Sequence, residues 1–375
     1  MRWRKSHIVY IDARWLVLKV VVVVLLAVAL TTYLKWTRVT LLEFESKDLA
    51  ASWRVSDPQV IRQVCRALSQ TTPAKGSRPR TGGITMRLTS QRETREYTFT
   101  EPGFIFDRKK ARLLKTPESL NGILQLAVGE LRKRSPFGDL VEWEEAGKLF
   151  PVGGEARVTD LDSGRKFSVR RTGGYSHADV EPLTGRDTAT VKLLYGGMWS
   201  WKRRAVVVET GGRKIAASLT GMPQGKGELK NNDCNGSIDL YFSGRITEKS
   251  SNLAHLMMIW KAAGKTREKL RGLSPGETLL VLFTALDQRD LKTLEQVVNP
   301  AGSIDRTMIQ DVIGVTITGM RKQAELTYQI TVLVSLQNGP YNQSRQVQVR
   351  LSRDQDLEIY RADASFLAAL LRQGK

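Results

Sequence analysis

The chain of 375 residues contains only two cysteines, Cys65 and Cys234. No paired-cysteine spacing typical of a zinc site is present. The two cysteines also fall in different modules of the domain order derived below, so a disulfide between them would have to cross modules. This low cysteine content excludes a small fold held together by disulfides. It fits an exported bacterial protein that needs no covalent cross-links.

Motifs for binding nucleic acid are absent as well. The formal net charge of +20 predicts an anionic partner, which can be nucleic acid, a membrane surface or an anionic wall polymer. The basic residues are spread along the chain without a dense basic arm. Neither a zinc-finger spacing nor a ribonucleoprotein aromatic pattern occurs. We therefore expect no nucleic-acid partner.

The clearest signal in the sequence is an apolar run at the amino terminus, from Trp15 to Leu34, interrupted only by Lys19. As a helix it would be about 30 Å long, which matches the hydrocarbon core of a membrane. Basic residues precede the run, which predicts a single-pass signal anchor with residues 1–14 in the cytoplasm and the bulk of the chain extracytoplasmic. A cleaved signal peptide is the alternative, but the small-residue triplet Ala27–Ala29 lies inside the apolar run.

Behind this predicted anchor, the pattern of strands, helices and loops predicts three small α+β modules, of which the central one is rich in β-strands. The first module covers residues 37–148. The third covers residues 266–375 and opens with a helix that Ser274 and Glu277 cap. A short second helix and a run of long strands follow. This order resembles the cone-shaped nuclear-transport-factor-two-like fold, also called SnoaL-like, which implies an accessory or docking unit.

The central module, residues 149–264, has three distinctive segments: "VRRTGGYSHADVEPLT", "YGGMWSWKRR" and "KIAASLTGMPQG". These segments resemble a domain of spore-forming Firmicutes that often lies downstream of peptidoglycan-binding repeats. The resemblance covers nearly all of this module but neither of its neighbours. It implies a role in the cell wall or the spore envelope, without implying a particular reaction.

This chain departs from that family at its reactive positions. The family carries a cysteine between two histidines on the strand that matches residues 236–242, a pattern typical of a thiolate nucleophile and its base. L,D-transpeptidases use the same chemistry to cross-link peptidoglycan. Here Asp239 stands at the cysteine position, Ser237 and Tyr241 replace the two histidines, and Gln224 replaces another. The replacements predict that this copy is more a binding protein than an enzyme. Cys234 lies in the loop before the strand.

Other polar residues can still form a binding cleft. His177, Asp179 and Glu181 alternate, so on a strand they would face one side and could bind a hard divalent ion or a substrate amine. A solvated turn is the simpler interpretation, and the sequence assigns neither a metal nor a cofactor. The remaining candidates lie at the replaced positions and on the closing helix: Gln224, Asp239, Tyr241 and His255.

A second candidate surface follows the short helix of the central module. Alternation places Trp199 and Trp201 on one face, and Lys202, Arg203 and Arg204 come directly after them. Flat aromatic rings near cations suit sugars and anionic polymers. Core packing of one of the two rings is an equally good interpretation.

These patterns together predict a membrane-anchored, extracytoplasmic protein with a non-catalytic binding or scaffolding role in peptidoglycan or spore-envelope biology. Its partner would be peptidoglycan, an anionic wall polymer or an envelope protein. The alternative is a transpeptidase-like or hydrolase-like enzyme that uses His177, Asp179 and Asp239. Convergence of the candidate residues without a nucleophile would indicate a binding pocket derived from an enzyme. Scattered residues would exclude the enzyme.

Overall fold

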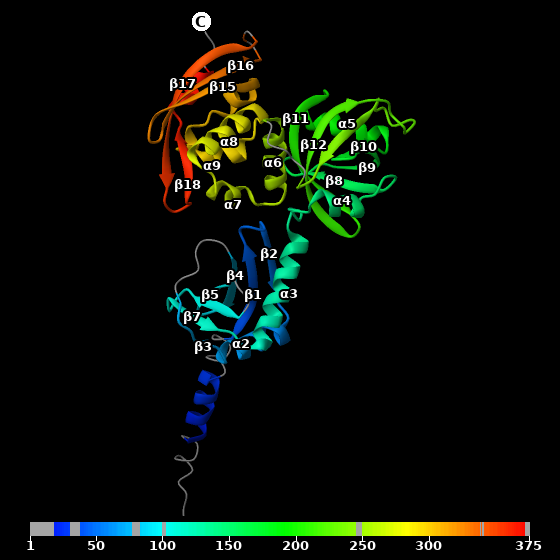
Figure 1. The fold of residues 1–375 in the computed structure, drawn as a ribbon. Coiled ribbons are helices and arrows are strands. Elements are labelled where there is room, and N and C mark those ends of the chain that lie inside the picture. Colours follow the sequence, from blue (N-terminus) through cyan, green and yellow to red (C-terminus); the bar gives the residue numbers. More distant parts are fainter. Residues whose placement is uncertain are drawn as a thin grey trace, which may run out of the picture. The chain divides into compact units, whose positions relative to one another are not determined.

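The computed structural model describes residues 19–30, 38–76, 83–99, 103–244, 250–337, 339 and 341–371. The chain forms two compact units that divide after Ser135. Both units combine helices with sheets of mostly antiparallel strands, so the protein belongs to the α+β class (Figure 1).

The predicted membrane anchor is wrong. Its described part, residues 19–30, is helical. Among the described residues, no helix is both long enough and apolar enough to cross a membrane. The single-pass topology and the cell-membrane location rested on that span and are corrected with it. The membrane as a partner stays a prediction. Residues 1–18 and 31–37, which carried the rest of these predictions, lie outside the described residues.

The first unit is a seven-stranded sheet with strand order β2-β1-β4-β5-β6-β7-β3. Its elements are β1 (Val39–Ser46), β2 (Ala51–Val55), α2 (Pro58–Ser69), β3 (Thr72–Pro73), β4 (Ile84–Ser90), β5 (Thr94–Phe99), β6 (Phe104–Asp107), β7 (Arg112–Lys115) and α3 (Glu118–Arg134). Alternate residues of β1, among them Leu42 and Phe44, are fully buried and share a core with apolar residues of α2 and α3. Cys65 lies on α2 and packs against this core.

The second unit begins with a closed six-stranded barrel, in the order β10-β13-β12-β11-β8-β9. Its elements are α4 (Trp143–Leu149), β8 (Glu155–Asp160), β9 (Lys166–Gly173), β10 (Ala178–Pro182), α5 (Gly185–Leu194), β11 (Ser200–Thr210), β12 (Arg213–Gln224) and β13 (Ser237–Tyr241). Trp143 and Ala146 of α4 belong to the barrel core. The boundary between the units therefore lies after Ser135, before residue 148, where the sequence predicted the first module to end.

The C-terminal part of this unit is a five-stranded sheet with helices on one side, and the sheet curves around α8 (Figure 1). Its elements are α7 (Thr266–Arg271), α8 (Pro275–Gln288), α9 (Leu291–Val297), β14 (Val298–Asn299), a 3-10 turn (Ala301–Ser303), α10 (Arg306–Gln310), β15 (Val312–Ala324), β16 (Thr327–Leu336), β17 (Gln343–Asp354), β18 (Ile359–Asp363) and α11 (Ser365–Leu371). The capping box predicted for α8 is present, because Ser274 and Glu277 each accept a hydrogen bond from the other's backbone amide.

One helix, α6 (Ser250–Ala262), connects the barrel to the C-terminal sheet. It packs on β11 and β12 and also contacts α8. Ala205 and Ala216 of the barrel strands share one apolar core with Met257 of α6 and Phe283 of α8. The two modules predicted separately from the sequence therefore form one continuous unit.

A buried lysine reinforces this connection. Lys261 on α6 places its Nζ 2.7 Å from Asp290 Oδ1 and 2.9 Å from Asp162 Oδ2. Asp290 precedes α9, and Asp162 lies in the turn between β8 and β9. The side chains of Lys261 and Asp290 are 8% and 1% exposed, so this pair is almost completely desolvated.

Replacing Lys261 by Met would leave the Asp290 carboxylate buried without its cation. Because an uncompensated buried charge is strongly unfavourable, we expect the free energy of unfolding to fall by about 3 kcal/mol, measured by urea denaturation of the full chain. The matched control is Lys265→Met, which breaks an exposed pair with Glu268 and should cost less than about 1 kcal/mol. Equal losses in the two variants would contradict the role of Lys261.

Candidate functional site

Four strands of the barrel place polar residues in one row across its outer face. The alternate residues that fill the barrel interior on β10 and β13 are Ala178, Val180, Ile238 and Leu240. Asp179 and Asp239 lie between these residues, so their side chains point outward. They are direct partners in the antiparallel register. Asp239 is in turn opposite Thr220 of β12, which is opposite Arg203 of β11.

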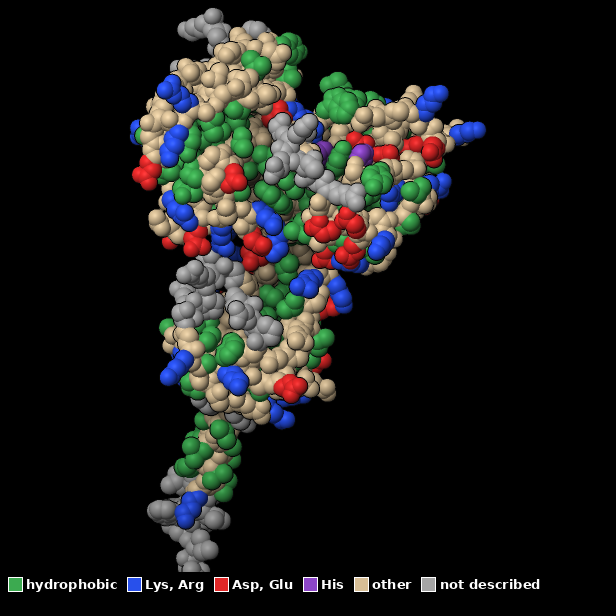
Figure 2. Space-filling model, in the orientation of Figure 1, with side chains coloured by type: hydrophobic (Ala, Val, Ile, Leu, Met, Phe, Trp, Pro, Cys, Tyr) green, Lys and Arg blue, Asp and Glu red, His purple; other side chains and the backbone are tan. Residues whose placement is uncertain are grey.

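His177, directly before β10, completes a cluster with these two carboxylates. Its Nε2 lies 2.9 Å from Asp179 Oδ1 and 3.8 Å from Asp239 Oδ1. The imidazole nitrogen and one oxygen of each carboxylate lie within 4.8 Å of one another. We call His177, Asp179 and Asp239 the barrel site. On the face drawn in Figure 2, histidine and acidic side chains lie together at the surface of the barrel.

The turn between β9 and β10 positions His177. Gly174 has a φ of 94°, a conformation that side-chain-bearing residues rarely adopt. A Cβ at this position would collide with the carbonyl oxygen of His177. Ser176 places its Oγ 3.2 Å from His177 Nδ1. The ring is therefore held on one side by a hydroxyl while Nε2 points to the carboxylates.

A stack of three rings supports the barrel site from the side of α6. The ring centroids of His177 and Tyr241 are 4.6 Å apart, and those of Tyr241 and His255 are 3.8 Å apart. His255 Nδ1 lies 2.9 Å from Ser218 Oγ. Burial, together with the nearby positive charge of Arg203, lowers the pKa of His255 to about 3. The ring is therefore neutral near pH 7 and accepts a hydrogen bond from Arg203 Nε at 3.4 Å.

Asp239 is the most buried member of the barrel site, with its side chain 10% exposed. Burial raises the pKa of its carboxyl above the usual range; His177 opposes this rise, and the charge of Asp179 adds to it. Gln224 Nε2 donates to Asp239 Oδ2 at 3.1 Å. Within the described part of the chain, neither carboxylate forms an ion pair with Lys or Arg. Two like charges thus face each other across a strand pair, an arrangement that destabilises a sheet.

Glu181 shares the outer face of β10 but is separate from the barrel site. It is fully buried. Its carboxylate accepts hydrogen bonds from the backbone amides of Glu228 and Leu229, at 2.7 and 3.0 Å, and from Asn232 Nδ2 at 3.4 Å. Glu181 therefore anchors the loop before β13. In the cluster with His177 and Asp179, the third residue is Asp239 and not the predicted Glu181.

Cys234 lies in this anchored loop and not on the strand. Its side chain is directed away from solvent, with 4% exposure, and its thiol donates to the carbonyl oxygen of Gly236 at 3.3 Å. Burial, with a contribution from the charge of Glu181, raises the pKa of the Cys234 thiol to about 11. A thiol of this kind is a poor nucleophile at neutral pH.

The residues from Trp199 to Arg204 are divided between core and surface. Trp199 packs against the barrel core, whereas Trp201 is 53% exposed. The cations bind groups of the protein itself: Lys202 binds Asp287, Arg203 binds the carbonyl oxygen of Trp201, and Arg204 binds Asp160. Trp201 is therefore the exposed ring of this run, and its cationic neighbours are engaged internally.

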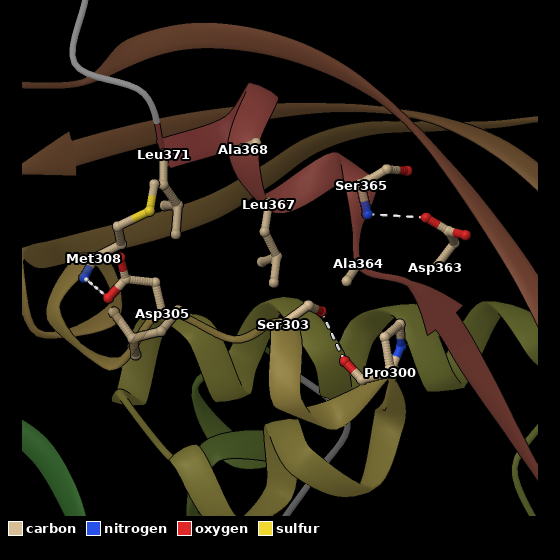
Figure 3. Close-up of a pocket in the computed structure, with 11 residues that line it drawn as sticks. Pro300, Ser303, Asp305, Met308, Asp363, Ala364, Ser365, Leu367, Ala368 and Leu371 are labelled. Carbon is tan, nitrogen blue, oxygen red and sulfur yellow. Dashed lines mark hydrogen bonds between the residues drawn. The ribbon is translucent and has the colours of Figure 1, made fainter.

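A separate cavity of about 370 Å³ lies in the C-terminal module, between α10, β18 and α11 (Figure 3). Met308 and Leu367 are among its apolar lining residues. The polar groups at its edge bond to neighbouring backbone: Asp305 to the Met308 amide, Asp363 to the Ser365 amide, and Ser303 to the Pro300 carbonyl. Because these groups are already paired, the barrel site is the stronger candidate for chemistry.

Sequence reasoning missed two residues beside the barrel site. Ser176 precedes His177 and contacts its ring. The glycine pair at 173–174 was the available signal, because a turn there places the residues that follow it at the edge of the sheet. Ser218 contacts His255. No sequence pattern predicts this contact, because it depends on where α6 packs against the barrel.

No protein-family model matches this sequence, and no curated protein matches it either. The resemblances of residues 149–264 and 266–375 to known domains therefore stay predictions.

The raised pKa of Cys234 predicts a slow thiol. At about pH 8, a thiol with a pKa of about 11 is about one-thousandth thiolate, whereas an ordinary cysteine is about one-quarter thiolate. We expect iodoacetamide to alkylate Cys234 in the folded protein more than about 100-fold slower than free cysteine, as measured by peptide mass spectrometry. Urea should restore the ordinary rate. A fast reaction without urea would contradict this assignment.

Asp239→Asn tests the opposed charges. The folded-state pKa of Asp239 is raised, so its carboxyl favours folding below the unfolded-state pKa and loses that contribution as the pH rises through the folded-state value. At about pH 7, we expect the Asn variant to be more stable than wild type by about 0.5 kcal/mol. The gain should vanish near pH 3, where Asp239 is protonated. Urea denaturation at both pH values measures the difference.

The matched control for this variant is Glu325→Gln, which changes an exposed carboxylate in the turn between β15 and β16. We expect its stability to stay within about 0.5 kcal/mol of wild type at both pH values. If Asp239→Asn were instead destabilising at neutral pH, the Asp239 carboxylate would be held by favourable contacts, and the barrel site would carry no electrostatic strain.

Proposed function

We propose that this protein is a non-catalytic binding protein whose barrel site holds a segment of peptidoglycan or a related anionic wall polymer. One observation carries the proposal: the predicted cleft residues converge on the outer face of the barrel, and a thiol nucleophile is not among them. The converging residues are His177, Asp179, Gln224, Asp239, Tyr241 and His255.

The chemistry of these side chains supports binding over acyl transfer. A carboxylate, Asp239, occupies the position at which the resembled family has its cysteine, and Gln224 holds that carboxylate in place. Cys234 is buried and bonded to a loop carbonyl. His255, the second histidine of the ring stack, is neutral and packed. The parts needed to form and activate a thiolate are therefore not assembled at this position.

The exposure of the barrel site supports a polymeric ligand. The side chains of His177 and Asp179 are 25% and 33% exposed, and Asp239 is 10% exposed beneath them. A ligand can therefore reach the site from solvent without opening the barrel. Carboxylates accept hydrogen bonds from hydroxyl and amide groups, and a sugar–peptide polymer carries many of both. The net charge of +20 favours the approach of an anionic polymer to the protein as a whole.

A pull-down of the full chain with purified insoluble peptidoglycan tests this function. We expect wild type to be retained at both about 50 mM and about 500 mM salt. The double variant Asp179→Asn/Asp239→Asn should be retained only at the lower salt, where diffuse charge suffices. A control pair of exposed carboxylates, Glu325→Gln/Asp356→Asn, should behave as wild type. Loss of wild type at high salt, or full retention of the site variant, would refute the proposal.

A second candidate function rests on one contact. Ser176 Oγ lies 3.2 Å from His177 Nδ1, and His177 Nε2 lies 2.9 Å from Asp179 Oδ1. A hydroxyl, an imidazole and a carboxylate in series are the parts of a serine hydrolase. Two of these residues, His177 and Asp179, also belong to the enzyme that the sequence offered as the alternative. Ser176 is exposed and adjacent to His177 in sequence, so a local turn explains the contact equally well.

A fluorophosphonate probe, which reacts with activated serines, separates the two functions. Under the binding proposal, Ser176 stays unlabelled after prolonged exposure of the folded full chain, as measured by peptide mass spectrometry. Labelling of Ser176 that His177→Gln abolishes would establish an activated serine and favour the hydrolase.

A further inference from the structure

We propose that the barrel site binds a divalent transition-metal ion through His177 Nε2 and one oxygen each of Asp179 and Asp239. This inference rests on the proposed function only for the last ligand of the ion. That ligand would be a carboxylate or phosphate group of the bound polymer. The binding of the ion itself depends on the chain alone.

The spacing of the donor atoms fits one ion. Bonds from zinc to nitrogen and oxygen ligands are about 2.0 to 2.2 Å long, so ligand atoms around one ion lie about 3 to 4 Å apart. The distances from His177 Nε2 to Asp179 Oδ1 and Asp239 Oδ1 are 2.9 and 3.8 Å. All three atoms lie within 4.8 Å of one another. Small rotations of the partly exposed Asp179 side chain would complete the geometry.

Independently of the donor spacing, the parts of His177 and Asp239 that face away from the proposed ion also have partners in the protein. Ser176 Oγ contacts His177 Nδ1 at 3.2 Å, on the side of the ring opposite Nε2. Gln224 donates to Oδ2 of Asp239 at 3.1 Å and leaves Oδ1 directed to the site. Tyr241 stacks on the imidazole. Outer partners of this kind orient the ligands of metal sites and select the coordinating nitrogen.

The charge of the barrel site points to a cation. Asp179 and Asp239 are cross-strand partners, and like charges in that position repel. The Asp239 side chain is only 10% exposed. Across the described ranges, its Oδ1 accepts no hydrogen bond, and its nearest basic atom is His177 Nε2 at 3.8 Å. A divalent ion between the two carboxylates would remove the repulsion and give Oδ1 a partner.

The ligand set selects the class of metal. Calcium needs six to eight oxygen ligands and magnesium prefers oxygen and water, whereas one imidazole with two carboxylates suits zinc, manganese or iron. Among these ions the general affinity order places Zn²⁺ above Mn²⁺. Three protein ligands leave a coordination position open. An anionic group of the polymer can occupy that position, which explains how an acidic site can bind an anionic partner.

The test is a calorimetric titration of the untagged full chain after treatment with EDTA and dialysis. We expect one Zn²⁺ per chain, weaker binding of Mn²⁺, and no binding of Mg²⁺ at the same concentration. His177→Gln, Asp179→Asn and Asp239→Asn should each weaken Zn²⁺ binding by more than about 100-fold. Gln224→Ala removes an outer partner and should weaken it by about 10-fold to 100-fold.

Matched controls separate this site from adventitious binding. His7→Gln changes a histidine elsewhere in the chain, Cys65→Ser removes a partly exposed thiol, and Glu325→Gln/Asp356→Asn removes two exposed carboxylates. We expect each of these variants to keep wild-type affinity, and circular dichroism confirms that the site variants are folded. Absence of Zn²⁺ binding by wild type, or binding that the folded site variants leave unchanged, would overturn the proposal.

Repeating the peptidoglycan pull-down with EDTA or with Zn²⁺ distinguishes the two proposals. Under the metal proposal, EDTA lowers retention at high salt and Zn²⁺ restores it. Stoichiometric Zn²⁺ binding without any retention of peptidoglycan would confirm the metal site and refute the proposed function. Retention that neither EDTA nor Zn²⁺ changes would support the proposed function and refute the role of the metal in it.

Discussion

The antiparallel register between β10 and β13 is the constraint on which the barrel site depends. Val180 and Ile238 are cross-strand partners, and both are fully buried in the barrel core. A slip of β13 by one residue would turn Ile238 to solvent and bring Asp239 into the apolar interior. The hydrophobic effect therefore fixes the register, and the register holds two mutually repelling carboxylates face to face. The free energy that assembles the site comes from the core behind it.

The helix α6 supports the barrel site through the ring stack. His255 of α6 stacks on Tyr241 and bonds to Ser218. The same helix shares its apolar residues with the C-terminal sheet, and Gln288 of α8 accepts a hydrogen bond from the Arg203 backbone amide at 2.7 Å. Ligand-binding side chains held by packed neighbours lose little conformational entropy on binding. The C-terminal module thus stabilises the barrel site without contributing a residue to it.

The side chains at the centre of the barrel site suit the binding role that we propose. A carboxylate, Asp239, stands on the outer face of the barrel, with the amide of Gln224 and the phenol of Tyr241 nearby. Asp239, Gln224 and Tyr241 can accept, donate and stack, and none of them is a strong nucleophile at neutral pH. These side chains are therefore suited to holding a ligand or an ion.

Local patterns in the sequence determined the α+β class and the capping box of α8, because period and caps depend on near neighbours. They also singled out the residues that meet at the barrel site. Only the tertiary structure decided that Glu181 anchors a loop, that the cations after Trp201 bind the protein itself, and that α6 belongs to two modules. These outcomes depend on strand register and packing between segments far apart in the chain, which no local pattern specifies.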